Sequence, residues 1–479
     1  MLHLNDFHSR HEPYAAGTAA CRPDQSCVGG SARIMGALRQ AREAARVEGR
    51  APLLLDAGDT FLGSLFFAHH QGLAEAAVQR AWGVGAMALG NHEFDRGPEV
   101  LAAYAEAAGF PLLCANLDAT AELVLAGRIL PTLGLRHGAA RLVVVGLVTP
   151  EVPGLSSPGP NLRFTDPMEA ASRAVWEARR EGPATVVALS HLGLAQDRRL
   201  AAEVAGLDVI VGGHSHTLVA PPEVVRGPDR PVVIVQAGAF GRYLGRLDLD
   251  LTVEGQVARH ELAMRELTAD VPEDADVAAI VARYAAPLGD LRRRVVGRLP
   301  GPLPAEGCGL GPCPLGTLVA EAMRQARRAE IGWQNGGGLR AGLPGGAVSW
   351  GDVLATLPFG NTVSRLVLRG GDILAELEHG ASRLPAPSGR FPQTAGLRFT
   401  VNASRPPGHR IDFAEVWVAD GQWQPLDPAR AYSIATNDFL RRGGDGYLRF
   451  RDHALEASDD GPLLEETLVR RLSGGAGSP

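Results

Sequence analysis

The chain has 479 residues, enough for two or three domains that each bury a full hydrophobic core. Its formal net charge of −6 argues against a general nucleic-acid binder, because neutralising a phosphate backbone requires a basic surface. The hydrophobic fraction of 45% is ordinary for a globular protein, and no apolar run approaches the roughly 20 residues needed to span a bilayer.

Hydrophobic runs and helical stretches alternate along the first 250 residues or so, which predicts an α/β domain. Strands are expected over residues 2–4, 53–55, 84–89, 110–114, 142–146, 186–189, 209–211 and 232–236, and helices over 32–47, 74–82, 98–108 and 167–180. Thr165 or Asp166 is expected to cap the last of these helices.

The second half of the chain mixes helix and strand signals without strict alternation, so we expect an α+β domain there. Residues 273–298 have helical spacing and a basic end, which suits a connecting helix. A Gly- and Pro-rich stretch follows and opens the second domain. The predicted division is a first domain over residues 1–270, a linker helix over 271–300, a second domain over 301–472 and a disordered tail over 473–479.

Five short polar clusters each follow a hydrophobic run that is typical of a strand buried on both faces. Because ligands bind at strand ends in sheet proteins, we expect these clusters to converge on one point. Aspartate, histidine and asparagine side chains together suit a metal centre, so the pattern predicts a metallohydrolase. The clusters contain Asp6 and His8, Asp59, Asn91 and His92, His191, and His214 and His216.

The cysteines form two close pairs, Cys21 with Cys27 and Cys308 with Cys313. Neither pair has the spacing of a zinc knuckle, so two local disulfides are favoured over metal binding. Two disulfides imply an oxidising compartment. The first strand begins at residue 2 and leaves no room for a signal peptide, so either a leader has been removed or the protein stays inside the cell. Cys114 is expected to be a buried thiol.

Four motifs in the first half resemble those of the calcineurin-like metallophosphoesterases: LNDFHSR at residues 4–10, DAGD at 56–59, GNHEFD at 90–95 and GHSH at 213–216. Four more extend the resemblance to the 5′-nucleotidase family: NGGGLR at 335–340, PFGN at 358–361, NDFL at 437–440 and GGDGY at 443–447. The resemblance covers essentially the whole chain. It implies an αββα sandwich with the metal site, a linker helix and an α+β substrate-binding domain, with short-range disulfides at both cysteine pairs.

The resemblance also implies two divalent metal ions that share Asp59 as a bridge. One ion would be held by Asp6, His8, Asp59 and His216, and the second by Asp59, Asn91, His191 and His214. This mixture of donors suits zinc, manganese, iron or cobalt better than calcium. Two carboxylates cancel only half of the four positive charges, so the site stays cationic and attracts phosphate. Metal binding would lower the pKa of a bound water and supply hydroxide at neutral pH.

His92 and Asp95 match the family's catalytic pair, in which the histidine stabilises charge on the reacting phosphoryl group or the leaving oxygen. The aspartate would orient that histidine. Glu93, between them, is expected to support the loop rather than bind metal.

In the second domain, the resemblance makes Phe359 and Phe439 the two faces of a nucleobase clamp. Asp445 would accept hydrogen bonds from ribose hydroxyls, and Asn335 and Arg340 would hold phosphate.

The chain departs from the family pattern at residue 309. Relatives commonly carry an arginine directly after the first cysteine of the second pair, and this arginine helps to bind phosphate. This chain has Gly309 at that position. We therefore expect it to bind phosphate more weakly than those relatives.

The sequence predicts a secreted or periplasmic hydrolase of nucleoside 5′-phosphates, with nucleoside diphosphates and UDP-sugars as further candidate substrates. The partner is a small nucleotide, with neither nucleic acid nor a membrane span expected. One alternative is a cyclic-nucleotide phosphodiesterase or thiosulfohydrolase-like ester hydrolase on the same scaffold. A more distant one is a non-catalytic surface-binding protein.

Overall fold

The computed structural model describes the whole chain except residues 16–20, 22–25, 63, 138–139, 419–420, 459–460 and 475–479. Most of the tail predicted to be disordered therefore lies outside the described residues. The chain divides into two compact units, Met1–Leu288 and Gly289–Pro479, which we describe separately.

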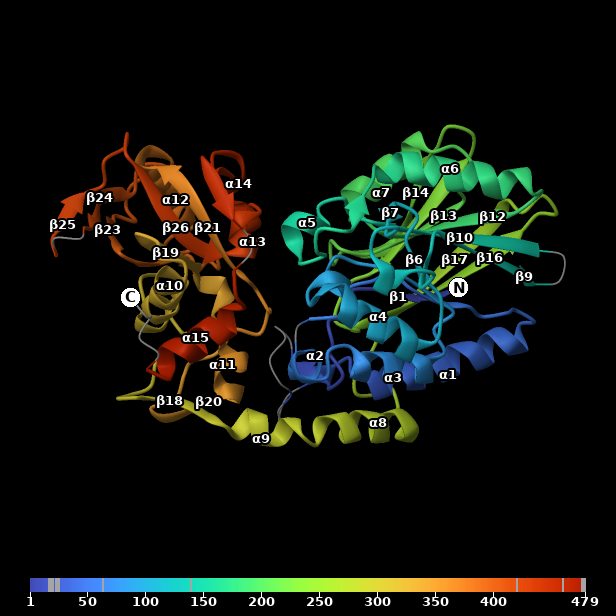
Figure 1. Cartoon of the computed structure of the whole chain (residues 1–479), viewed down its shortest axis with the longest axis horizontal. Coiled ribbons are helices and arrows are strands. Elements are labelled where there is room, and N and C mark those ends of the chain that lie inside the picture. Colours follow the sequence, from blue (N-terminus) through green and yellow to red (C-terminus); the bar gives the residue numbers. More distant parts are fainter. Residues whose placement is uncertain are drawn as a thin grey trace. The chain divides into compact units, whose positions relative to one another are not determined.

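Two mixed β-sheets lie face to face in the N-terminal unit (Figure 1). The first has the order β17 (Val257–Glu266), β16 (Tyr243–Leu251), β1 (Leu2–Leu4), β4 (Leu54–Asp56), β5 (Ala86–Ala88), β6 (Leu112–Leu113), β8 (Ile129–Leu130). The second has the order β14 (Leu218–Arg226), β15 (Pro231–Ala237), β13 (Val209–Gly212), β12 (Thr185–His191), β10 (Ala140–Val148), β9 (Thr132–His137). The neighbours β1, β4, β5, β6 and β8 are parallel, as are β10, β12, β13 and β15.

Helices cover the outer faces of both sheets, so the unit has the expected αββα layers (Figure 1). The first sheet is covered by α1 (Ser31–Val47), α3 (Leu73–Trp82) and α4 (Gly97–Ala108), and the second by α6 (Pro167–Arg180) and α7 (Leu194–Glu203). Strand β10 shows how the sequence builds these layers. Val143 and Val145 pack beneath the helices of the second sheet, whereas Val144 faces the first sheet, because alternate side chains of a strand point to opposite faces.

Short elements occupy the loops of this unit. They are β2 (Tyr14–Ala15), β3 (Cys27–Val28), α2 (Leu65–His70), η1 (His92–Phe94), β7 (Leu117–Asp118), η2 (Leu123–Leu125), α5 (Val152–Leu155) and β11 (Arg163–Phe164).

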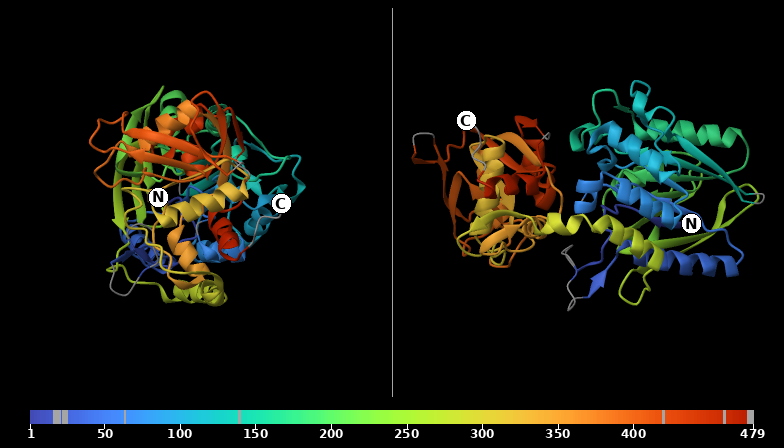
Figure 2. Two further views of the ribbon diagram at one scale, coloured as in Figure 1. Left: turned by 90° about the vertical axis from the view of Figure 1, so that its left-hand side faces the viewer. Right: turned by 60° about the horizontal axis from the view of Figure 1, so that its bottom comes forward.

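Residues 271–300, expected to form a single linker helix, contain two short helices. Helix α8 (Ala275–Ala285) packs against α1 and α3 of the same unit (Figure 2), and α9 (Leu288–Arg293) follows it. Pro287 separates them, because proline lacks a backbone N–H and restricts the residue before it. The helical expectation is wrong for residues 295–298, which belong to strand β18 (Val295–Leu299). The β-branched Val295 and Val296 favour a strand there.

The C-terminal unit has a central sheet with helices on both faces. Its strand order is β22 (Pro392–Ala395), β19 (Ile331–Asn335), β26 (Ala431–Asn437), β21 (Val363–Arg369), β27 (Glu456–Ser458). One face packs on α10 (Pro314–Ala326), α11 (Trp350–Thr356) and α15 (Leu464–Leu472), and the other on α12 (Gly370–Ala381) and α14 (Leu448–Asp452). A small sheet of β23 (Leu397–Val401), β24 (Ile411–Trp417) and β25 (Trp423–Pro425) packs into the hydrophobic core on the α12 and α14 face. Strand β20 (Gly346–Ser349) pairs with β18. The loops contain η3 (Gly336–Gly338), α13 (Asp438–Arg441) and η4 (Gly444–Gly446).

In the part of the chain that the structure describes, no helix is both long and apolar enough to cross a membrane.

Candidate metal centre

The predicted metal ligands lie where parallel strands of both sheets end. Strands β1, β4 and β5 lead into the loops with Asp6 and His8, Asp59, and Asn91, whereas β12 ends at His191 and β13 leads into His214 and His216. Because the carboxyl ends of parallel strands share one edge of a sheet, residues far apart in the sequence meet here.

Asp6 and Asp59 are surrounded by imidazole rings. His191 Nε2 lies 3.0 Å from Asp59 Oδ2, and His216 Nε2 lies 3.4 Å from Asp6 Oδ1. His8 Nε2 lies 3.0 Å from His216 Nε2 and 4.0 Å from a carboxylate oxygen of each aspartate. Among the residues that the structure describes, three overlapping groups are spaced closely enough to hold a metal ion: Asp6, His8 and His216; His8, Asp59 and His92; and Asp59, His191 and His214.

The hydrogen bonds of these side chains fit a divalent metal. His191 Nδ1 lies 2.7 Å from the carbonyl oxygen of Ala57, and His8 Nδ1 lies 3.1 Å from that of Phe61. In each ring Nδ1 therefore donates to a carbonyl, which leaves Nε2 as a ligand atom. Oδ1 of Asn91 is buried and has no hydrogen-bond partner among the described residues. A bound cation would satisfy that oxygen.

The backbone at several of the predicted ligands is held in the left-handed region. The φ angles are 49° at Asp6, 50° at His8, 56° at Asp59, 72° at His214 and 55° at His216. A non-glycine residue in this region costs about 1 to 3 kcal/mol, and such residues cluster at functional sites. The fold therefore holds these side chains against their local conformational preference.

Glu93 supports the loops around Asp59, as its place in the motif predicted. Its buried carboxylate accepts hydrogen bonds from the backbone N–H groups of Gly90 (2.6 Å), Asp59 (2.9 Å), Thr60 (2.8 Å) and Phe61 (3.2 Å). Burial and the nearby Asp59 raise the pKa of Glu93 to about 7. This one side chain connects the Asp59 loop to the loop that carries Asn91 and His92.

Electrostatics favour neutral imidazoles at His8 and His214. At His191, by contrast, burial is outweighed by the charge and the hydrogen bond of Asp59, which raise the pKa to about 10. Burial and the neighbouring His216 lower the pKa of His8 to about 3, and burial and His191 lower the pKa of His214 to about 4. Burial would raise the pKa of Asp59, but the surrounding histidines hold it well below its usual value. Neutral imidazole and ionised carboxylate are the forms that bind metal.

His92 and Asp95 form a hydrogen-bonded pair beside this cluster. His92 Nδ1 lies 2.8 Å from Asp95 Oδ2, and the His92 ring centroid lies 5.3 Å from that of His8. The backbone N–H of His92 also donates to Asp59 Oδ1 at 2.9 Å.

In the C-terminal unit, Phe359 and Phe439 are partly exposed, at 37% and 44%. Phe439 lies in α13, and Phe359 lies in the loop before β21. Asp438 links the two segments, because its carboxylate accepts hydrogen bonds from Asn361 Nδ2 (2.9 Å) and from the Thr362 N–H (3.1 Å).

The remaining predicted substrate-binding residues form two separate groups, Asn335 with Asp445 and Arg340 with Phe359. Asn335, at the end of β19, donates from Nδ2 to Asp445 Oδ2 at 2.7 Å, and Asp445 has a φ of 53°. Arg340 donates to the Gly337 carbonyl at 3.5 Å, and its guanidinium carbon lies 5.9 Å from the centre of the Phe359 ring.

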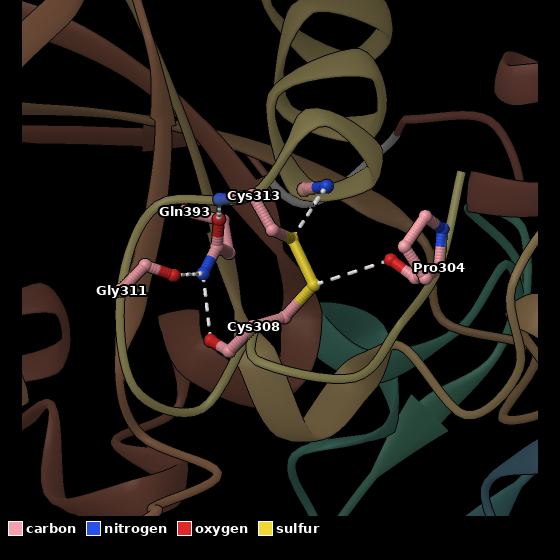
Figure 3. Close-up of a disulfide and its surroundings, with 6 residues drawn as sticks. Pro304, Cys308, Gly311, Cys313 and Gln393 are labelled. Carbon is pink, nitrogen blue, oxygen red and sulfur yellow. Dashed lines mark hydrogen bonds between the residues drawn. A yellow bond between two sulfur atoms is a disulfide. The ribbon is translucent and has the colours of Figure 1, made fainter. Parts of the chain in front are cut away.

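Both cysteine pairs form disulfides, Cys21–Cys27 and Cys308–Cys313, and Cys114 is a free, buried thiol. Gln393 braces the second disulfide loop by donating from Nε2 to the carbonyls of Cys308 (2.7 Å) and Gly311 (2.8 Å) (Figure 3). Gly309 lies in this loop, and its carbonyl accepts from the Ser388 N–H at 2.9 Å.

Comparison with known proteins agrees with this architecture. Residues 1–218 match the calcineurin-like phosphoesterase family, and residues 295–452 match the 5′-nucleotidase C-terminal domain. The chain is 32% identical to the 5′-nucleotidase of Bos taurus over 493 residues, which covers 95% of this chain and 85% of the relative. The chain belongs to the 5′-nucleotidase family.

Solved structures of this architecture are also similar along the whole chain. A 5′-nucleotidase precursor from Thermus thermophilus is 35% identical with a TM-score of 0.72, covering 99% of this chain and 96% of that one. The NAD nucleotidase of Haemophilus influenzae is 26% identical with a TM-score of 0.70, covering 99% and 95%. A sulfate thiohydrolase of Thermus thermophilus is 25% identical with a TM-score of 0.67, covering 99% and 93%. Together with the grouped ligand atoms, the family makes this chain a metal-dependent phosphoester hydrolase.

Two residues that support the site were not expected from the sequence. Asn5 donates from Nδ2 to Asp6 Oδ2 at 2.6 Å and accepts from the Ala237 N–H at 2.8 Å. Ser156 donates from Oγ to Asp95 Oδ1 at 2.8 Å. Asn5 lies inside the first motif and could have been found there, whereas no local signal marks Ser156.

Proposed function

We propose that this chain hydrolyses nucleoside 5′-monophosphates to a nucleoside and phosphate. The observation that carries the proposal is the pair of partly exposed rings, Phe359 and Phe439, on segments linked by Asp438. Aromatic side chains stack on nucleobases with about 1 to 3 kcal/mol per base, and this stacking tolerates different bases. Asp445, on the turn that follows Phe439, supplies a carboxylate that suits ribose hydroxyls.

At the phosphate end, the proposed ligands would hold two divalent metal ions, of zinc, manganese, cobalt or iron. These ions would supply positive charge to the phosphate and lower the pKa of a bound water. The role proposed for His92 is to stabilise charge on the phosphoryl group or the leaving oxygen through Nε2. Asp95 would hold the proton on Nδ1 and fix the ring. Asn335 and Arg340 would contact the phosphate.

A second candidate function is hydrolysis of another ester on the same scaffold. Gly309 favours it, because the second disulfide loop then lacks the arginine that would bind phosphate. The similarity to a sulfate thiohydrolase supports the same alternative. The two exposed rings favour the nucleotide.

We also propose that the protein acts outside the cytoplasm, in the periplasm or as a secreted enzyme. Its two disulfides support this proposal, because disulfides persist in oxidising compartments.

Steady-state kinetics on adenosine 5′-monophosphate and ribose 5-phosphate test the proposed substrate. We expect the metal-loaded enzyme to hydrolyse the nucleotide far more efficiently, and Phe439→Ala to remove most of that preference. Phe413→Ala is the matched control, since Phe413 is a similarly exposed phenylalanine (50%) on β24 of the same unit. Equal efficiency on both substrates, unaffected by Phe439→Ala, would exclude the aromatic clamp.

Gly309→Arg tests whether the missing arginine side chain weakens phosphate binding. We expect it to lower the KM for the nucleotide if the loop reaches the phosphate. A Cβ atom at Gly309 would lie 3.1 Å from the Ser388 carbonyl oxygen, so Ser388 must shift slightly to admit the side chain. A melting temperature close to that of the wild type would show that the loop accepts the arginine.

A substrate screen distinguishes the nucleotide from the alternative esters. It covers nucleoside diphosphates, UDP-sugars, cyclic nucleotides and thiosulfate esters, each with manganese, zinc or cobalt.

A further inference from the structure

The carboxylate of Asp95 has two partners. Oδ2 lies 2.8 Å from His92 Nδ1, and Oδ1 accepts a hydrogen bond from Ser156 Oγ at 2.8 Å. The Asp95 side chain is only 14% exposed. The histidine, the aspartate and the serine therefore form one continuous hydrogen-bonded chain beside the proposed metal ligands.

Ser156 follows a segment whose start is anchored at the end of β10. Strand β10 runs parallel to β12, with Val148 level with His191, and the backbone N–H of Thr149 donates to the His191 carbonyl at 3.0 Å. The side chain of buried Asn116 holds both backbone groups of Val148, at 2.8 and 3.0 Å. The segment that leads to Ser156 is thus attached to the end of β12, which carries the proposed ligand His191.

The core holds both partners in place. Val152 begins the short helix α5 and is fully buried, and Phe94, which precedes Asp95, is buried in the same hydrophobic cluster. The backbone N–H of Ser156 donates to the Val152 carbonyl at 2.9 Å, which ends α5. Ser156 and Asp95 are therefore each close in the chain to a residue of the same hydrophobic core.

A single hydrogen bond leaves an aspartate carboxylate free to rotate, because the terminal torsion of this side chain has a broad energy minimum. A second partner on the other oxygen fixes the carboxylate plane. A fixed carboxylate in turn holds the imidazole plane of His92 and the proton on its Nδ1. Ser156 is suited to this role because it touches Asp95 at the oxygen that His92 does not use.

We propose that Ser156 is a positioning residue of the hydrolase, which acts through Asp95 to hold His92 in its working orientation. The inference rests on the proposed role of His92 and Asp95 in phosphoester hydrolysis. It adds a third residue to that pair, from a segment that carries none of the predicted site residues.

The test is a double-mutant cycle on the full-length, metal-loaded enzyme. We expect Ser156→Ala to lower kcat about 3- to 30-fold, because a hydrogen bond to a charged group is lost, while KM changes less than twofold. In the Asp95→Ala background, removing Ser156 should have no further effect, since a residue that acts through Asp95 has nothing left to orient. Additive effects of the two substitutions would overturn the proposal.

Two further variants separate positioning from structural support. Ser156→Thr keeps the hydroxyl, and threonine suits the extended backbone of Ser156 (φ −154°), so most of the lost kcat should return. Ser172→Ala, which removes an exposed hydroxyl bonded to the Met168 carbonyl, should behave as wild type. Metal content and melting temperature should stay unchanged in Ser156→Ala. Loss of metal, or a threonine variant as slow as the alanine variant, would contradict the proposal.

The choice of substrate keeps this test independent of the nucleotide proposal. Each variant is assayed on adenosine 5′-monophosphate and on 4-nitrophenyl phosphate, which needs no nucleobase clamp. If the wild type hydrolyses only the aryl ester, the nucleotide proposal fails while the cycle on Ser156 and Asp95 can still be completed. If both esters are hydrolysed and the cycle is additive, only the positioning role fails.

Discussion

At the scale of single residues, Asp59 connects the parts of the candidate site. It belongs to two of the three groups that could hold a metal ion, and its Oδ2 lies 3.0 Å from His191 Nε2. Its Oδ1 accepts the backbone N–H of His92 at 2.9 Å. The histidines keep the pKa of Asp59 well below its usual value, so the carboxylate is ionised at neutral pH and can bridge two cations.

Replacing this proposed bridging carboxylate should disable the enzyme. We expect Asp59→Asn to lower turnover by at least about 100-fold and to reduce metal content in parallel, because an amide brings no charge to either ion. Atomic emission on the purified variant measures the metal, and hydrolysis assays measure turnover. Asp276→Asn, at an 88% exposed side chain, is the matched control. Wild-type activity with full metal content in Asp59→Asn would remove this residue from the site.

At the scale of secondary-structure elements, the two sheets of the N-terminal unit approach closely where β10 crosses β6. A Cβ atom at Gly146 would lie 2.4 Å from backbone atoms of Leu113, and the Gly146 carbonyl accepts the Ala115 N–H at 2.7 Å. A side chain at this position would push the sheets apart.

We therefore expect Gly146→Ala to destabilise the protein by about 1 to 3 kcal/mol, the usual cost of overpacking a core. Thermal or urea unfolding measures the change. Gly134→Ala on the neighbouring strand β9 is the control, because a Cβ atom there would meet nothing within 4 Å. Equal stability of the two variants would show that the sheets can separate without cost.

Glu376 links α12 to α14 in the C-terminal unit, where its carboxylate accepts the Arg449 N–H at 2.6 Å. Burial raises the pKa of Glu376 to about 7, although the N–H and the charge of Arg449 oppose the shift. Below pH 4.5 the folded and unfolded states both hold the proton. Between about pH 4.5 and 7 the unfolded state releases it first, so stability falls as the pH rises through this window.

Glu376→Gln should therefore gain stability relative to wild type as the pH rises from 4.5 to 7, by up to about 3 kcal/mol. Thermal unfolding of both proteins across this range measures the difference. Glu456→Gln, at an exposed position on β27, controls for the loss of one charge. Parallel pH profiles for Glu376→Gln and wild type would contradict the assigned shift.

At the scale of the whole molecule, the chemistry is divided between the two units. Every proposed metal ligand and the His92–Asp95 pair lie in Met1–Leu288, whereas the proposed clamp residues lie in Gly289–Pro479. Metal should therefore stabilise only the first unit, because a ligand that binds the native state stabilises it by mass action.

Chelation should abolish hydrolysis and lower the melting temperature of one unfolding transition by several degrees, leaving the other unchanged. At a free metal concentration 1,000 times Kd, the stabilisation lost is about 4 kcal/mol. Scanning calorimetry with and without chelator measures both transitions, and added manganese, zinc or cobalt should restore the first. A shift confined to the C-terminal unit, or none in either, would contradict the placement of the metal site.

The amino-acid sequence by itself determined the families of both halves and many of the local elements, but not strands β9, β14, β16, β17 and β18. Helix α6 spans the predicted residues 167–180, because hydrophobic periodicity and an acidic cap are local signals. The ligand motifs could be found because each follows its own strand. Between Thr165 and Asp166, only the structure identified the cap: Asp166 accepts the N–H groups of Met168 and Glu169.

The tertiary structure alone decided how distant segments meet at the site. Ser156 reaches Asp95 across 61 residues because Val152 and Phe94 share one core, and no local pattern encodes that contact. The four backbone hydrogen bonds of Glu93 likewise depend on two loops folding around one carboxylate. Local sequence specifies which residues end a strand, whereas the packing of the sheets and helices sets which of those residues touch.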